Sequence, residues 1–113
     1  MSRLTTHVLD SLSGRPAAGV SVRLSSGGVA LAETATNADG RCDAPLLAGA
    51  AMKAGAYRLE FGVGEYYRGL GVALPEPPFL DVVALEFGIS DAGAPYHVPL
   101  LVSPYAYSTY RGS

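Results

Sequence analysis

The 113-residue sequence contains one cysteine and two histidines, and only 16% of its residues are charged. A single cysteine cannot form an intramolecular disulfide, which excludes a disulfide-stabilised secreted fold. Two histidines make a poor metal site, and the paired Cys/His spacing of zinc sites is missing, so we expect no metal. The charged fraction is well below the roughly 25% of an average globular protein. We therefore expect part of the surface to be covered by other copies of the chain.

Long apolar runs are also missing. The longest apolar stretches, such as residues 82–85, have the length of a strand and fall far short of the roughly 20 residues of a membrane helix. The first residues lack the apolar region of a signal peptide. Ten acidic residues outnumber eight basic ones, which are scattered and do not suggest a nucleic-acid partner. We expect a cytoplasmic protein with no membrane or nucleic-acid partner, and without a P-loop or dinucleotide fingerprint we expect no cofactor.

Residues 1–113 have the length of a single domain, and their dominant pattern is a period of two. Short segments of alternating apolar and polar residues predict strands over 20–25, 29–36, 57–62, 80–89, 96–102 and 105–111. We expect the segment 80–89 to be largely buried. A tight turn is predicted over 37–40, and a helix of one or two turns over 65–70. The predicted fold is mainly β, an antiparallel β-sandwich of about seven to eight strands with one short helix.

Few side chains in this pattern suggest chemistry. His97 alternates with an apolar set and should point away from the core, His7 lies in the first predicted strand, and Arg41 follows the predicted turn. Each also has an ordinary explanation: a surface histidine, a hydrogen-bonded strand histidine and a solvated arginine. Arg111 fits an edge-strand charge that discourages unwanted pairing, and Cys42 fits a small buried apolar residue. From spacing alone, the function stays open.

Four segments carry a resemblance to a known family. They are LTTHVLD at 4–10, TNADGRC at 36–42, YHVPLLVSPY at 96–105 and STYRGS at 108–113. Together they resemble the transthyretin-related 5-hydroxyisourate hydrolases over essentially the whole chain. The tetrapeptide YRGS at 110–113 is specific, because hormone-carrying transthyretins differ there. Pro95 departs from the family pattern, in which a polar residue or another histidine is common at that position.

The resemblance implies a transthyretin-like β-sandwich that assembles as a homotetramer, a dimer of dimers, with active sites in the channel between the dimers. It implies hydrolysis of 5-hydroxyisourate to 2-oxo-4-hydroxy-4-carboxy-5-ureidoimidazoline, a step of urate degradation in purine catabolism. The alternative is a non-catalytic transthyretin-like carrier that binds a small aromatic ligand in the same channel. The catalytic residues implied are His7, Arg41, His97 and Ser113, and the substrate-binding residues are His7, Arg41, Tyr110 and Arg111.

The residue types agree with this chemistry. Opening a cyclic amide with water needs a base for the water, a donor for the developing oxyanion and a proton for the leaving nitrogen. We expect His7 or His97 to be the base, with Arg41 lowering its pKa and donating hydrogen bonds to the substrate. Ser113 could hold a histidine or the substrate through its hydroxyl or its terminal carboxylate. The residues alone leave open which histidine is the base and which strand edges form the dimer.

Overall fold

The computed structural model describes residues 2–112, which form nine strands, one α-helix and one 3₁₀ turn. The strands are β1 (Arg3–Asp10), β2 (Arg15–Pro16), β3 (Ser21–Ser26), β4 (Val29–Ala35), β5 (Leu47–Ala48), β6 (Gly55–Gly62), β7 (Val82–Ile89), β8 (Tyr96–Val102) and β9 (Tyr107–Thr109). The helix α1 spans Val63–Gly69, and the 3₁₀ turn spans Gly49–Ala51. The predicted short helix is confirmed, beginning two residues earlier than expected. Within residues 2–112 no helix is long and apolar enough to cross a membrane.

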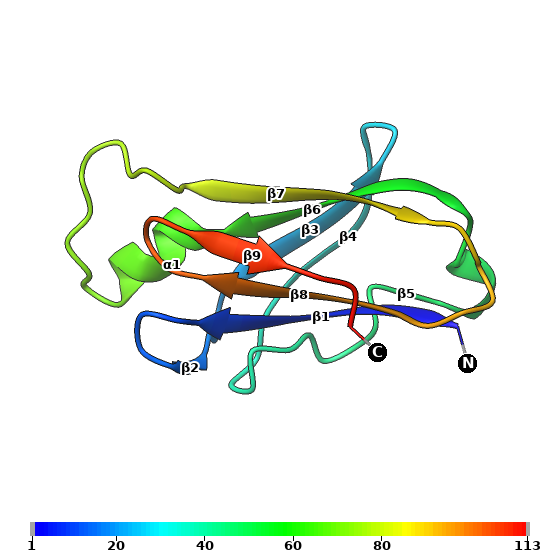
Figure 1. The fold of residues 1–113 in the computed structure, drawn as a ribbon, viewed down its shortest axis with the longest axis horizontal. Helices are drawn as coiled ribbons and strands as arrows, with labels where there is room; N and C mark the ends of the chain where they lie inside the picture. The colour runs from blue at the N-terminus through cyan, green and yellow to red at the C-terminus, as the bar shows by residue number, and fades with distance from the viewer. Residues whose placement is uncertain (1, 113) are drawn as a thin grey trace.

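The strands form two sheets, and the predicted β-sandwich is confirmed (Figure 1). One sheet has the order β2-β1-β8-β9, with β5 also paired to β1, and the other has the order β4-β3-β6-β7. One pair departs from the antiparallel pattern, because β1 and β8 run parallel from Leu4↔Tyr96 to Asp10↔Val102. Parallel strands need a long connection. Here the chain between β1 and β8 contains all four strands of the second sheet.

The prediction of a largely buried strand over 80–89 was wrong. Among the described residues, the strand β7 pairs with β6 alone and forms an edge of its sheet, and its residues alternate between buried and exposed. Val82 is 57% exposed, whereas the inward-facing Val83 and Leu85 are buried. An apolar run of this length does not distinguish a central strand from an edge strand, because side chains on both are drawn from the same residue types.

The core lies between the two sheets and determines which face of β1 is free. Leu4, Thr6 and Val8 are buried, whereas Thr5 and His7 on the same strand are half-buried and face the other way. Successive side chains of a strand alternate between its two faces. The outer face of the first sheet therefore carries Arg3, Thr5 and His7, whereas Thr6 and Asp10 lie on the inner face.

A buried carboxylate ties α1 to the end of β1. Asp10 is 1% exposed and accepts hydrogen bonds from the hydroxyls of Tyr67 (2.6 Å), Tyr66 (3.0 Å) and Ser13 (3.0 Å) and from the N–H of Leu12 (3.0 Å). Burial acts to raise the pKa of Asp10 and is the largest single effect, but the hydrogen bonds together outweigh it and hold the pKa below its usual value. The carboxylate is therefore ionised and fully hydrogen-bonded at neutral pH.

We expect the substitution Asp10→Asn to lower the free energy of unfolding by about 2 kcal/mol at neutral pH, because hydroxyl donors would then face an amide. Because the pKa of Asp10 is lowered in the folded state, its contribution is present above the unfolded pKa of about 3.9 and is lost as the pH falls through the folded pKa. Urea denaturation at fixed protein concentration measures both effects. The difference between wild type and variant should shrink in acid.

The matched control is Asp91→Asn, which changes an exposed carboxylate in the turn before β8. Its denaturation midpoint should stay close to that of the wild type. Equal midpoints for Asp10→Asn and Asp91→Asn near pH 7 would contradict the stabilising role of the buried carboxylate.

Candidate active site

The outer face of the first sheet gathers the predicted site residues through strand register. Thr5 on β1 lies directly opposite His97 on β8, and His7 follows Thr5 on the same face. Thr5, His7 and His97 thus form a row on the outer face. Two isolated β-bridges extend this row, one between His7 and Arg41 and one between His97 and Gly112. Side chains of directly opposite residues have Cβ atoms about 5 Å apart. The fold therefore brings both histidines and Arg41 together from three distant segments of the chain.

The predicted turn over 37–40 is present, and it fits tightly against β1. The side-chain carbonyl of Asn37 accepts a hydrogen bond from the N–H of Arg41 (3.2 Å), and the N–H of Val8 donates to the carbonyl of Gly40 (2.8 Å). Gly40 has φ +74°, and a Cβ at this position would lie 2.5 Å from the carbonyl oxygen of Val8. Only glycine accommodates both constraints. The turn can therefore approach β1 closely and place Arg41 beside His7.

The C-terminal segment packs directly against His97. The N–H of Gly112 donates to the carbonyl of His97 (2.7 Å), and a Cβ on residue 112 would lie 2.7 Å from Cδ2 of the His97 ring. A side chain at this position would displace the imidazole. Glycine at position 112 thus lets the chain cross beside the ring without moving it.

A cavity of about 610 Å³ opens over this row. Its lining includes four of the predicted site residues, His7, Arg41, His97 and Tyr110. It also includes Pro95, the residue that departs from the family pattern, together with residues not singled out from the sequence, Arg3, Thr5, Tyr96 and Gly112. The signal for Arg3 and Thr5 is the period of two, which places residues 3, 5 and 7 on one face.

Arg111 lies outside this cavity. The guanidinium of Arg111 sits over the ring of Tyr96, 4.1 Å from its centroid, and donates to the carbonyl of Pro95 (3.2 Å). Arg111 lines an apolar groove between β7 and β9, whereas the cavity above His97 is lined by its neighbours Tyr110 and Gly112. Ser113, the fourth predicted catalytic residue, lies outside the described residues.

The electrostatics of the cavity keep both histidines neutral. Burial lowers the pKa of His7 most, Arg41 lowers it further, and the carbonyl and carboxylate of Asp39 act in the opposite direction. The pKa of His97 is lowered by burial, then by Arg41 and then by His7. Since an ordinary histidine pKa is near 6.5, both imidazoles are neutral near pH 7. Each ring therefore offers one N–H and one lone pair for proton transfer.

Other ligand and nucleophile sets are not available in the part of the chain that the structure describes. Residues 2–112 contain no group of three His, Cys, Asp or Glu side chains placed to hold a metal ion. Cys42, predicted to be buried, is half-buried and packs against the core, and burial raises the pKa of its thiol. A protonated thiol is a poor nucleophile. Neutral histidines and an arginine are side chains suited to acid–base catalysis and hydrogen bonding.

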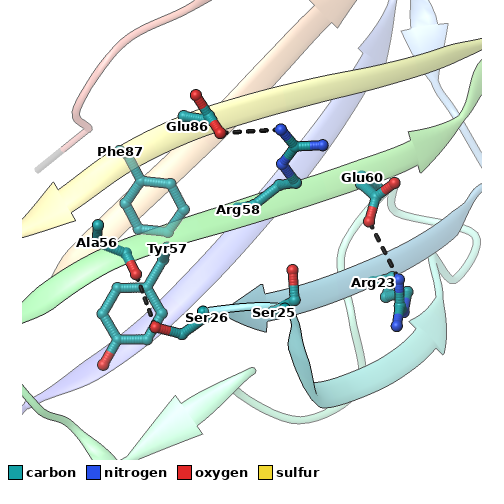
Figure 2. A pocket seen from close by; sticks show the side chains of 11 residues that line it. Arg23, Ser25, Ser26, Ala56, Tyr57, Arg58, Glu60, Glu86 and Phe87 are labelled. Atoms are coloured by element: carbon teal, nitrogen blue, oxygen red, sulfur yellow. Dashed lines mark hydrogen bonds and ion pairs between the residues drawn. The ribbon is translucent and has the colours of Figure 1, made fainter.

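A second hollow of similar size, about 650 Å³, lies on the outer face of the other sheet (Figure 2). Its charged side chains pair with one another across the strands: Arg58 with Glu86 (2.9 Å) and Arg23 with Glu60 (3.4 Å). Exposed pairs of this kind contribute little to stability, and each cation is already neutralised. The cavity above His7 and His97 is therefore the stronger candidate for the active site.

Comparison with known proteins agrees with this architecture. The model of the HIUase/Transthyretin family matches residues 4–112. The chain belongs to this family. Among curated members of the HIUase/Transthyretin family, a 5-hydroxyisourate hydrolase of Ralstonia nicotianae is 57% identical and is aligned over 100% of both chains. A 5-hydroxyisourate hydrolase of Mesorhizobium japonicum is 60% identical over 98% of this chain and 92% of its own length.

Solved structures show the same HIUase/Transthyretin fold. The 5-hydroxyisourate hydrolase of Klebsiella pneumoniae superposes with a TM-score of 0.86 at 38% identity, covering 100% of both chains. An (S)-allantoin synthase superposes with a TM-score of 0.93 at 43% identity. The match covers 99% of this chain but only 44% of the synthase chain. The transthyretin-like sandwich predicted from the sequence is thereby confirmed.

Proposed function

We propose that this chain acts as a single 5-hydroxyisourate hydrolase domain that adds water to the cyclic amide of its substrate, giving 2-oxo-4-hydroxy-4-carboxy-5-ureidoimidazoline. The observation that carries the proposal is the cavity lined by His7, His97 and Arg41, in which the charge of Arg41 lowers the pKa of both histidines. Full-length relatives at 57% and 60% identity bear the name of this hydrolase. They support the enzyme over the transthyretin-like carrier.

The chemistry follows from the three side chains. One neutral histidine accepts a proton from water as the water oxygen bonds to the ring carbonyl carbon. The planar guanidinium of Arg41 donates hydrogen bonds to the oxygen on which negative charge develops. As the C–N bond breaks, the histidine that took the proton from water passes it to the leaving nitrogen. The ring opens by direct attack of water, and no covalent enzyme intermediate is formed.

Product analysis tests the proposed reaction. 5-Hydroxyisourate is generated from ¹³C-labelled urate by a urate-oxidising enzyme, and carbon NMR follows it with and without this protein. We expect the carboxylate signal of the ring-opened product to appear faster with the protein than in buffer. A non-catalytic carrier would instead bind intact 5-hydroxyisourate stoichiometrically and leave its decay unaccelerated, and that outcome would overturn the proposal.

The substitution Gly112→Ala should lower kcat by about 10²-fold, because a displacement of a catalytic group by about 1 Å has an effect of this size. The added methyl group would push the His97 ring from its position. Kinetics on 5-hydroxyisourate and thermal melting measure the activity and the fold. The matched control is Gly69→Ala at the end of α1, where a Cβ would contact nothing within 4 Å. A wild-type kcat for Gly112→Ala would remove the C-terminal segment from the site.

The proposal includes assembly as a cytoplasmic homotetramer, a dimer of dimers with the cavities facing the channel between dimers. In the described residues, β7 and β9 each pair along one edge only. Between them runs a groove with an apolar lining that includes Leu85, Phe87 and Val98. Unpaired strand edges beside apolar surface favour association with a second copy. Native mass spectrometry tests the tetramer, and a monomer at micromolar concentration would contradict it.

A further inference from the structure

In the cavity, His97, a candidate catalytic residue, contacts Thr5, which has no assigned role. The hydroxyl oxygen Oγ1 of Thr5 lies 2.8 Å from Nδ1 of His97. The parallel ladder of β1 and β8 places the two residues directly opposite each other. Behind Thr5, the buried hydroxyl of Thr6 donates to the carbonyl of Val98 (2.7 Å) and fixes the same register from the core side. The contact is therefore built into the sheet.

The direction of this hydrogen bond follows from the available partners. Within residues 2–112, the Thr5 hydroxyl has one hydrogen-bond partner, Nδ1 of His97. A neutral imidazole accepts a hydrogen bond only at its unprotonated nitrogen. If Nδ1 carried the proton, the Thr5 hydroxyl would have no acceptor among these residues. The contact therefore favours donation from the hydroxyl to Nδ1, with the proton of neutral His97 on Nε2.

His7 lies on the same face of the first sheet as Thr5. A neutral imidazole carries one N–H and one lone pair, so the unprotonated nitrogen of His7 can accept a proton. His7 and His97 line the same cavity. One ring then presents a lone pair for a water proton, and the other presents an N–H.

We propose that Thr5 is a positioning residue that holds His97 in the Nε2–H tautomer, so that the Nε2–H group of His97 donates a hydrogen bond to the substrate while His7 accepts the proton of water. The part of this proposal that assigns roles in catalysis to His7 and His97 rests on the proposed hydrolase function. His7 gains a proton as the O–C bond forms and passes it to the leaving nitrogen as the C–N bond breaks, while His97 keeps its Nε2 proton throughout. Both rings are neutral again when the product leaves. Protons and charge balance over the cycle.

The tautomer is measured without substrate. Because the sequence holds only two histidines, ¹⁵N-histidine labelling gives a simple spectrum, and the variant His97→Gln assigns it. Long-range proton–nitrogen correlation near neutral pH should show His97 unprotonated at Nδ1. The Nδ1 resonance should move when Thr5→Val removes the donor and should stay close to its wild-type position in Thr5→Ser. A His97 proton on Nδ1, or an unmoved resonance in Thr5→Val, would overturn the proposal.

Kinetics test whether the Thr5 hydroxyl contributes to catalysis. Thr5→Val should lower kcat about tenfold with little change in KM, and Thr5→Ser should restore most of the rate, because the hydroxyl and not the methyl group is required. The matched control is Thr34→Val, an exposed threonine on β4 in the other sheet, which should leave the Nδ1 resonance and kcat unchanged. An unrescued Thr5→Ser variant with a wild-type fold would assign Thr5 to packing and contradict the proposal.

Glutamine variants distinguish the roles of the two histidines. A glutamine amide can donate a hydrogen bond but is not a base, so His97→Gln should retain more activity than His7→Gln. The reverse order would exchange the two roles. If the protein does not hydrolyse 5-hydroxyisourate, the proposed function fails while the tautomer result stands. If it hydrolyses the substrate with Nδ1 of His97 protonated, only the role of Thr5 fails.

Discussion

Replacing His7 with alanine is expected to lower kcat for 5-hydroxyisourate by about 10²–10⁴-fold, the usual contribution of a general base. His7 is half-buried on the outer face of β1, whereas the core is built from Leu4, Val8 and their neighbours on the inner face. The substitution therefore removes the base and leaves the packing of the sandwich intact. Absorbance progress curves give kcat, and circular dichroism reports the fold.

Two additional measurements make the His7 result specific. Imidazole added to the buffer should partly restore the activity of His7→Ala, since it supplies the missing base in the cavity. The control Leu31→Ala truncates an exposed strand side chain of the other sheet and should keep the wild-type rate. A wild-type kcat for a folded His7→Ala variant would remove His7 from the mechanism.

Arg41→Ala is expected to lower kcat/KM by about 10²–10³-fold, the effect of losing a donor to a developing oxyanion. It should also change the pH dependence. Arg41 lowers the pKa of both His7 and His97, so removing its charge raises both pKa values. The base is then protonated at a higher pH, and the acid limb of the pH–rate profile moves toward higher pH.

Arg41→Lys separates the two roles of this residue. Lysine keeps the positive charge beside the histidines but loses the planar pair of donors. We expect the acid limb of the pH–rate profile to stay close to that of the wild type while kcat falls. If Arg41→Ala leaves the acid limb unmoved, the electrostatic coupling between Arg41 and the histidines is wrong. If Arg41→Lys has the wild-type rate, bidentate donation is not required.

Local patterns predicted much of the fold because they report which face of a strand is buried. The alternation around His97 correctly placed its side chain away from the core, and the Asn37–Gly40 cluster correctly predicted the turn that presents Arg41. Edge position is not a local property. The apolar run at β7 was therefore taken for a buried strand, although its second edge is unpaired within the described residues.

The site was harder to predict because its contacts join distant parts of the chain. Thr5 and His97 are separated by 92 residues, and only the parallel register of β1 and β8 makes them neighbours. The pKa shifts of the two histidines could also be predicted only in part. Arg41 contributes as expected, but burial contributes more, and burial of a half-exposed strand residue depends on segments such as the one that contains Gly112. Charge can be read from a sequence, whereas this burial cannot.

The central claim is that His7, Arg41 and His97 form one hydrolytic site. The most direct test follows the absorbance of freshly generated 5-hydroxyisourate in buffer, with wild-type protein and with an equal concentration of folded His7→Ala. We predict that the first-order decay constant rises in proportion to the wild-type concentration and stays near the spontaneous value with the variant. A decay constant with wild-type protein no larger than in buffer, or a decay constant with the variant equal to that of the wild type, would contradict the account.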